Sequence, residues 1–165
     1  MKITANEEYG LRIMLRLALL LDKQEGALVS LNDIAEAEGF SVENTAAILS
    51  KLREGELIES VRGKYGGYKL ANNPEEINLY QVLQALSKDT FGIEFCESHS
   101  GIKTKCVHNE DCSVRPVWTG LSALIQNFLA GITLKQLMQN ESGCQSQLKD
   151  NFKILQDITE RNLAI

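Results

Sequence analysis

The feature that most constrains the fold is a pair of short capped helices within residues 30–54, followed at once by a glycine-rich hairpin. Ser30 is expected to cap the first helix, with Asp33 placed to answer it three residues later, and Gly39 to end it. Ser41 is expected to cap the second helix. The inner face of that helix is predicted to hold Val42, Thr45, Leu49 and Leu52. Two helices joined by a tight glycine-containing turn are typical of a helix-turn-helix, although an ordinary helical hairpin has the same pattern.

The hairpin after these helices is predicted from strands at residues 57–61 and 68–70, with a turn at residues 62–67. Its charges are those of Arg62, Lys64 and Lys69, in a chain whose formal net charge is −5. Glycines let a backbone approach phosphates closely, and basic side chains supply the attraction. The segment is therefore predicted to be the wing of a winged helix-turn-helix that binds double-stranded DNA. The alternative is a surface hairpin that happens to be basic.

Helices dominate the rest of the prediction. Apolar residues recur at helical spacing over residues 6–21 and again over residues 75–87. A short capped helix is expected from Thr133, with Gln136 three residues on, and a weak one near Phe152. The fold class is therefore mainly α.

A long helix is expected to begin near Val114. Its apolar residues step by three, four, three and four, which is heptad spacing and favours pairing with a second copy of the chain. They are Val114, Val117, Leu121, Leu124 and Phe128. We therefore expect a winged helix-turn-helix domain at residues 1–87, a cysteine-containing loop at 88–113, and a dimerisation helix with its tail at 114–165. A core-facing helix of a monomer is the alternative.

Three of the four cysteines, Cys96, Cys106 and Cys112, lie in one polar loop with the spacing C-x9-C-x5-C. Structural free cysteines usually lie among apolar residues, whereas these have charged, polar and glycine neighbours. Thiolates are the natural ligands of iron–sulfur clusters and zinc, so the loop is a candidate metal site. Zinc held with His108, a metal-free thiol–disulfide switch and inert surface thiols remain as alternatives. Cys144 stands apart and is interpreted as incidental.

Composition excludes several classes of protein. With 165 residues and 44% hydrophobic residues, the chain can bury a core. The most apolar stretch is interrupted by Arg16 and falls short of the roughly 20 residues that span a bilayer. We therefore expect a cytoplasmic protein with no membrane partner. No nucleophile motif or phosphate loop is present, so an enzyme is not expected.

Several motifs together resemble the IscR/NsrR/RirA family of bacterial winged-helix regulators, from the start of the chain to about Gln139. They are residues 1–4, Tyr9, the wing sequence at residues 61–70, the C-x5-C pair followed by Trp118, and residues 131–137. The resemblance implies a homodimer whose long helices cross, with each cysteine loop near the DNA-binding part of its partner. It also implies an iron–sulfur cluster held by Cys96, Cys106 and Cys112.

The fourth ligand differs from one branch of that family, in which a His follows the last cysteine by three residues. Here that residue is Arg115, which stays protonated and cannot bind iron. Another branch uses an acid before the first helix's apolar run, so the resemblance points to Glu8 of the partner subunit. An ordinary favourable acid in a helix's first turn is the alternative for Glu8. His108, His99 and Asp111 are further candidates. We expect a 2Fe–2S cluster, with 4Fe–4S as the alternative.

The predicted function is a transcription regulator, a repressor in the first instance, that senses iron, redox state or nitric oxide and binds a palindromic promoter site. A metal-free thiol sensor on the same fold and an iron–sulfur electron carrier are the alternatives. In the family, the wing arginine enters the minor groove, a role that falls on Arg62. Ala46 stands where one member has a base-reading acid, so the target sequence is expected to differ. The predicted DNA-contacting residues are Ser41, Glu43, Asn44, Thr45, Lys51, Arg62, Lys64 and Tyr65.

Overall fold

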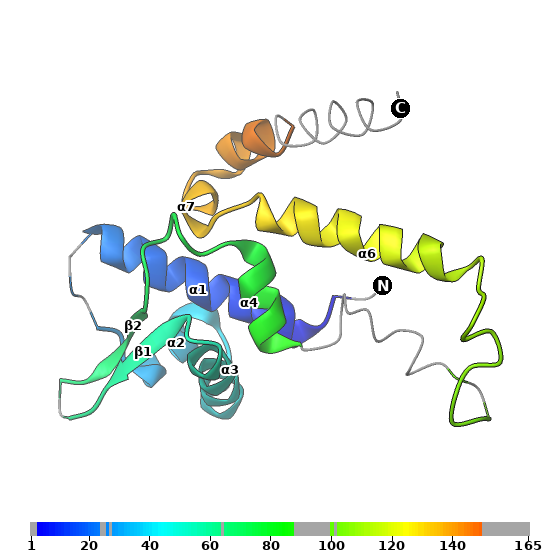
Figure 1. Ribbon diagram of the computed structural model, residues 1–165. Coiled ribbons are helices and arrows are strands. Elements are labelled where there is room, and N and C mark those ends of the chain that lie inside the picture. The colour runs from blue at the N-terminus through cyan, green and yellow to red at the C-terminus, as the bar shows by residue number, and fades with distance from the viewer. Residues whose placement is uncertain are drawn as a thin grey trace.

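The protein is a helical body with a two-stranded wing and a long helix that extends from it, as the computed structural model in Figure 1 shows. The structure describes residues 3–23, 26, 28–63, 65–87, 100 and 102–149. Cys96, His99, Lys64 and the weak helix expected near Phe152 therefore lie outside the described residues. Among the described residues, no helix is long and apolar enough to cross a membrane.

The DNA-binding body begins with α1 (Ala5–Lys23), which crosses the middle of the molecule. The predicted pair of helices follows as α2 (Leu31–Glu38) and α3 (Val42–Glu54). Ser30 accepts a hydrogen bond from the Asp33 amide, and Gly39 ends α2 in the left-handed conformation with φ 71°. These caps confirm the boundaries that the sequence predicted for α2.

The wing is an antiparallel hairpin of β1 (Ile58–Val61) and β2 (Gly67–Leu70), paired from Ile58 opposite Leu70 to Val61 opposite Gly67. Val29, before α2, pairs with Tyr68 in an isolated bridge, which ties the hairpin to the helices. A β-carbon on Gly67 would come within 2.6 Å of the Val29 carbonyl oxygen. Only glycine allows this close approach of the two backbones.

Two further short helices close the body. The helix α4 is Leu79–Leu86, shorter than the predicted 75–87, because Asn78 is held extended as its N-cap in a capping box with Gln81. The helix α7 is Leu134–Leu137, and Thr133 and Gln136 form the predicted capping box. The long helix α6 is Arg115–Ala130, and residues 141–149 are helical.

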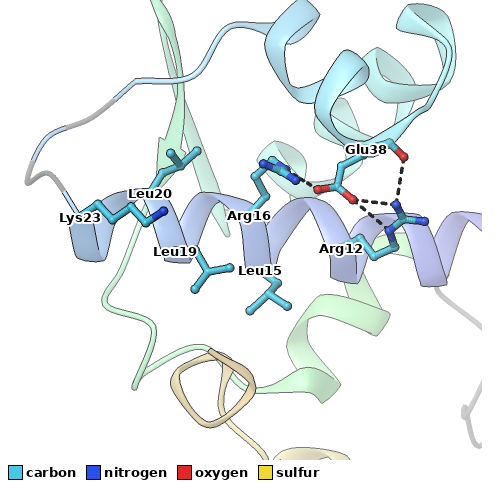
Figure 2. A pocket seen from close by; sticks show the side chains of 7 residues that line it. All are labelled: Arg12, Leu15, Arg16, Leu19, Leu20, Lys23 and Glu38. Carbon is cyan, nitrogen blue, oxygen red and sulfur yellow. Dashed lines mark hydrogen bonds and ion pairs between the residues drawn. The ribbon is translucent and has the colours of Figure 1, made fainter. Parts of the chain in front are cut away.

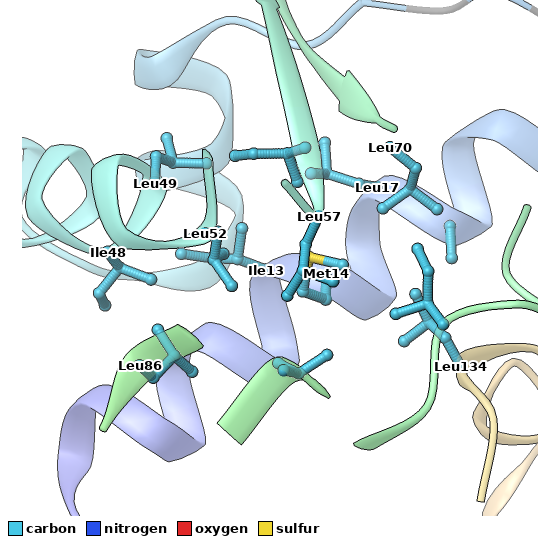
Figure 3. Packing of buried hydrophobic residues seen from close by; sticks show 14 of the residues in the cluster. Ile13, Met14, Leu17, Ile48, Leu49, Leu52, Leu57, Leu70, Leu86 and Leu134 are labelled. Carbon is cyan, nitrogen blue, oxygen red and sulfur yellow. The ribbon is translucent and has the colours of Figure 1, made fainter. Parts of the chain in front are cut away.

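One apolar core joins α1, α3, α4, the hairpin and α7 (Figure 3). Ile13, Leu49 and Leu134 are among its buried members, so even the short α7 contributes to the core of the DNA-binding body. The predicted inner face of α3 is confirmed for Thr45, Leu49 and Leu52. It is wrong for Val42, which is 43% exposed because it lies in the first turn of the helix.

Charged residues hold α2 against α1 on the outside of the core (Figure 2). The Glu38 carboxylate accepts hydrogen bonds from both Arg12 and Arg16, and Arg12 also donates to the Glu38 carbonyl oxygen at 2.9 Å. The guanidinium of Arg12 lies 4.7 Å from the ring centre of Phe40. Because the carboxylate is shared by two arginines, the angle between α1 and the helix pair is held from the outside as well as by the core.

Candidate nucleic-acid interface and metal centre

The first turn of α3 presents polar side chains at the surface. The Ser41 hydroxyl accepts a hydrogen bond from the Asn44 amide at 3.2 Å, which starts the helix at this point. Ser41 and Glu43 are exposed, and Asn44 is half-buried. An asparagine in the first turn of a recognition helix has the amide group that pairs with adenine in the major groove.

Two residues predicted to contact DNA are engaged elsewhere in the structure. Thr45 is completely buried, and its hydroxyl donates to the Ser41 carbonyl oxygen at 2.9 Å, so it cannot contact DNA in this conformation. The Lys51 ammonium donates to the carbonyl oxygen of Leu86 at 3.1 Å, at the end of α4. The structure therefore corrects the assignment of Thr45 to the interface, whereas that of the half-buried Lys51 stays a prediction.

The turn of the wing places Arg62 and Tyr65 at the surface, and the Tyr65 side chain is 84% exposed. Gly63 has φ 120°, a backbone conformation that residues other than glycine rarely adopt. Lys69 forms an ion pair with Glu59 across the hairpin at 2.9 Å, so its charge is largely neutralised. The basic character predicted for the wing therefore depends on Arg62, with Lys64 outside the described residues.

The helix α3 and the wing lie on the same side of the molecule, whereas α6 lies on the other side, with α1 and α4 between them (Figure 1). The helix α4 contacts both α3 and α6. The helix α3 and the wing thus lie where both can face one common surface, away from α6.

The loop before α6 turns its cysteines inward. Cys106 and Cys112 are half-buried, whereas every other residue from 102 to 113 is exposed, including the apolar Ile102 and Val107. The Asn109 amide donates to the Cys106 carbonyl oxygen at 3.1 Å, and the Arg115 amide donates to that of Cys112 at 3.2 Å. Two thiols are thus partly shielded while the rest of residues 102–113 faces solvent, and this donor set fits the soft ligands that an iron–sulfur cluster needs.

The structure describes only part of the predicted ligand set. Among the described residues, no group of three His, Cys, Asp or Glu side chains could hold a metal ion. Cys96 lies outside the described residues, and the other predicted ligand, Glu8, lies at the start of α1. Within the cysteine loop, Cys106 and Cys112 are therefore the predicted cysteine ligands that the structure describes.

The two neighbouring acids at the start of α1 differ in availability. Glu7 is 1% exposed, and its carboxylate accepts a hydrogen bond from the Thr4 amide at 2.6 Å, as part of the cap of α1. Glu8 is exposed. The structure therefore leaves Glu8, and not Glu7, accessible to a partner chain.

Sequence analysis missed one contact in the cysteine loop. The Nη2 atom of Arg115 donates to the carbonyl oxygens of Asn109 at 2.5 Å and of His108 at 3.3 Å. The sequence only showed that Arg115 cannot bind iron. No periodicity or motif signals a contact between an arginine side chain and backbone carbonyls six and seven residues earlier.

Several apolar side chains along one face of α6 are exposed. No residue of α6 is buried. Val117 is 61% exposed and Leu124 is 57% exposed, and Val114 and Leu121 are also exposed. A contiguous apolar face of this kind is typical of a protein–protein contact.

Comparison with known proteins identifies the chain. Residues 3–140 match the family model of Rrf2, described as an iron-dependent transcriptional regulator. The chain belongs to the Rrf2 family. It is a transcription regulator with a winged helix-turn-helix fold, as the sequence predicted.

Relatives in the Rrf2 family include regulators named IscR. The chain is 37% identical over 152 residues to the HTH-type transcriptional regulator IscR of Aliivibrio salmonicida, which covers 92% of this chain and 86% of the relative. The IscR of Photorhabdus laumondii is 33% identical over 86% of this chain and 81% of its own length. The resemblance to IscR-type regulators is thus confirmed over most of the sequence.

Solved structures of Rrf2-type regulators share the fold. The structure of T. potens IscR matches with a TM-score of 0.63 and 29% identity, over 84% of this chain and 86% of that one. CymR, the global cysteine regulator of B. subtilis, matches with a TM-score of 0.64 and 28% identity, over 84% and 96%. The oxidised form of Staphylococcus aureus CymR matches with a TM-score of 0.62 and 28% identity, over 84% and 97%.

Proposed function

We propose that this Rrf2-family regulator is a homodimer whose affinity for a palindromic promoter site depends on an iron–sulfur cluster, held by Cys96, Cys106, Cys112 and Glu8 of the partner subunit. The observation that carries the proposal is the half-burial of Cys106 and Cys112 within residues 102–113, which are otherwise exposed. The names of the IscR relatives and the iron-dependent description of the family support it. When bound, a cluster of this kind, 2Fe–2S in the first instance, supplies a centre that reacts with oxygen or nitric oxide. We place the protein in the cytoplasm and assign it no enzymatic activity.

The surface of α6 supports the proposed assembly into a dimer. Its exposed apolar side chains recur at heptad spacing, which suits packing against the same helix of a second copy. A two-fold pair of winged helices would then place two α3 helices in successive major grooves, and this symmetry calls for a palindromic site. In each subunit, Ser41, Glu43 and Asn44 would face bases, and Arg62, Lys64 and Tyr65 would contact the backbone or minor groove.

A signal from the cysteine loop has a physical route to the DNA-binding body. The loop leads directly into α6, and α6 leads into α7, whose Leu134 is fully buried in the core. Asn78 and Thr133, the N-caps of α4 and α7, pair with each other in an antiparallel bridge. A shift of the loop relative to α1 of the partner would therefore be transmitted through α6 to α4 and α3. A few kcal/mol of differential stabilisation is enough to change such an equilibrium from mostly bound to mostly free.

A metal-free thiol switch is the second candidate, favoured by the similarity to CymR, a cysteine regulator solved in an oxidised form. The same half-buried pair, Cys106 and Cys112, would then be the reactive thiols. The two candidates differ in whether iron is needed for the change in DNA binding.

The test compares binding of the anaerobically purified protein to its own promoter region before and after removal of iron by a chelator. We expect the dissociation constants to differ by about tenfold or more, and Cys106→Ala to behave like the iron-free protein in both states. Equal binding with and without iron, together with a response to a thiol oxidant that Cys106→Ala abolishes, would contradict the cluster mechanism and support the thiol switch.

A variant of Glu8 and a matched control variant test the assignment of Glu8 as the fourth ligand. Glu8→Ala should change the visible spectrum and accelerate loss of the cluster in air, because an iron atom loses its oxygen ligand. Glu76→Ala, at an exposed acid between β2 and α4, serves as the control and should change neither property. An unchanged spectrum and oxygen sensitivity in Glu8→Ala would exclude Glu8 as a ligand.

A further inference from the structure

Few interactions within the segment between Cys106 and Cys112 stabilise its conformation. Residues 107–111 are all exposed, so no apolar packing fixes them. The amide-to-carbonyl hydrogen bond from Asn109 to Cys106 closes only the first turn. Exposed backbone without packing opens readily, so something outside this segment has to hold its middle.

Arg115 supplies that hold from the first residue of α6. Its Nη2 atom donates to the carbonyl oxygens of both His108 and Asn109, and its own amide donates to the carbonyl oxygen of Cys112. The Arg115 side chain is itself half-buried. One residue of a regular helix thus contacts both the middle and the end of the segment that carries the two thiols.

We propose that Arg115 is a positioning residue for the cysteine site: its guanidinium fastens the middle of the Cys106–Cys112 segment to α6 and keeps both thiols half-buried before any metal binds. This inference rests on the proposed function for its purpose, but its structural part holds for the iron-free chain. It also gives a role to the residue that stands where a branch of the family has a histidine ligand.

The chemistry of the guanidinium suits this role. Arginine keeps its charge at any physiological pH and directs several N–H groups in a fixed plane, so one side chain can serve two neighbouring carbonyl oxygens. A lysine ammonium keeps the charge but has a compact head on a flexible stem and holds such a pair less firmly. Glutamine keeps a donor but loses both the charge and the reach.

The first test uses the iron-free protein and hydrogen exchange of the peptide that covers residues 106–112. We expect exchange to be about tenfold faster in Arg115→Gln and several-fold faster in Arg115→Lys, because a charge-assisted hydrogen bond is lost or weakened. Arg53→Gln, at an exposed arginine of α3, is the control for the change of charge and should match wild type. Unchanged exchange in Arg115→Gln would overturn the proposal.

The second test uses the iron-loaded protein and the rate at which a chelator removes iron. Removal of a residue that orients metal ligands typically weakens metal binding by 10- to 100-fold, so we expect Arg115→Gln to lose iron about tenfold faster or more, with partial rescue in Arg115→Lys. The midpoint of thermal unfolding should stay at the wild-type value, because α6 contributes no buried residue to the core. An equal rate of iron loss in Arg115→Gln and wild type would contradict the positioning role.

The two proposals fail in different ways. If the wild-type protein binds no iron, the proposed function is wrong, and the exchange measurement still decides whether Arg115 holds the segment. If the wild type binds iron but Arg115→Gln changes neither exchange nor iron loss, only the positioning role is wrong.

Discussion

The winged-helix body and the long helix α6 use their apolar residues in opposite ways. From α1 to α4, with Leu134 of α7, apolar side chains are buried in one core within a single chain. Along α6, no residue is buried, and Leu121 is 46% exposed. Burial of apolar area is the main source of folding free energy, so the body has its own core, whereas the exposed face of α6 supports the proposal that it packs against a second chain.

The largest expected effect tests that difference at α6 itself. Leu121→Asp combined with Leu124→Asp should weaken the dimer by about a thousandfold or more, because two central apolar contacts are replaced by desolvated charges. Analytical ultracentrifugation over a range of concentrations would measure it. The matched change in the body is Leu49→Ala. It should lower the free energy of unfolding by about 2–5 kcal/mol and leave the dissociation constant of the dimer unchanged. A double mutant that stays dimeric at micromolar concentration would refute the role assigned to α6.

The next largest effect is expected from a substitution in the wing, and it concerns DNA binding alone. Arg62→Ala should weaken binding to the promoter by about 1–3 kcal/mol and reduce the slope of log affinity against log salt by about one, because a charged contact to DNA is lost. Fluorescence anisotropy at several salt concentrations would show both changes. Lys69→Ala is the control, since Lys69 is already paired with Glu59, and it should have a much smaller effect. Equal effects of the two substitutions would show that the wing acts only through its total charge.

The smallest effect concerns the contact between the N-caps of α4 and α7, which links the winged-helix body to the segment that follows α6. Thr133→Ala removes the side-chain cap of α7 and should cost about 1 kcal/mol of stability, as measured by urea unfolding. Because Thr133 also pairs with Asn78, the variant should reduce the difference in DNA affinity between the iron-loaded and iron-free protein. Ser30→Ala, which removes the cap of α2, should cost a similar amount of stability and leave that difference unchanged. If Thr133→Ala loses stability but keeps the full difference in DNA affinity, the contact between Asn78 and Thr133 is not part of the route from the cysteine loop to the DNA-binding body.

Local signals explain why so much of the body could be predicted. Ser30, Gly39, Ser41 and Thr133 act through hydrogen bonds within a few residues, so the sequence shows both the cap and the helix it starts. The assignment of Thr45 to the interface conflicts with the periodicity that placed it on the inner face of α3, and the structure agrees with the periodicity, since Thr45 is buried. The contact of Lys51 with the Leu86 carbonyl oxygen has no sequence signal, because it joins residues 35 positions apart.

For the candidate metal site, the sequence predicted the type of ligand but not how the ligands are positioned. The cysteine spacing indicated a soft metal site, but neither the inward turn of Cys106 and Cys112 nor the hold of Arg115 has a sequence signal, because both depend on backbone carbonyls in an irregular loop. The resemblance already pointed to Glu8, and the structure adds that the neighbouring Glu7 is buried as part of the cap of α1.

Iron and acid-labile sulfide analysis of the anaerobically purified chain tests the central claim most directly, with Cys106→Ala and Cys144→Ala measured beside the wild type. Cys144 is half-buried like Cys106 but lies beyond α7, away from the loop. The account predicts iron, sulfide and visible absorbance in the wild type and Cys144→Ala, and their loss in Cys106→Ala. A colourless wild type without iron under strict anaerobiosis, or a Cys106→Ala variant with the wild-type content of iron and sulfide, would contradict it.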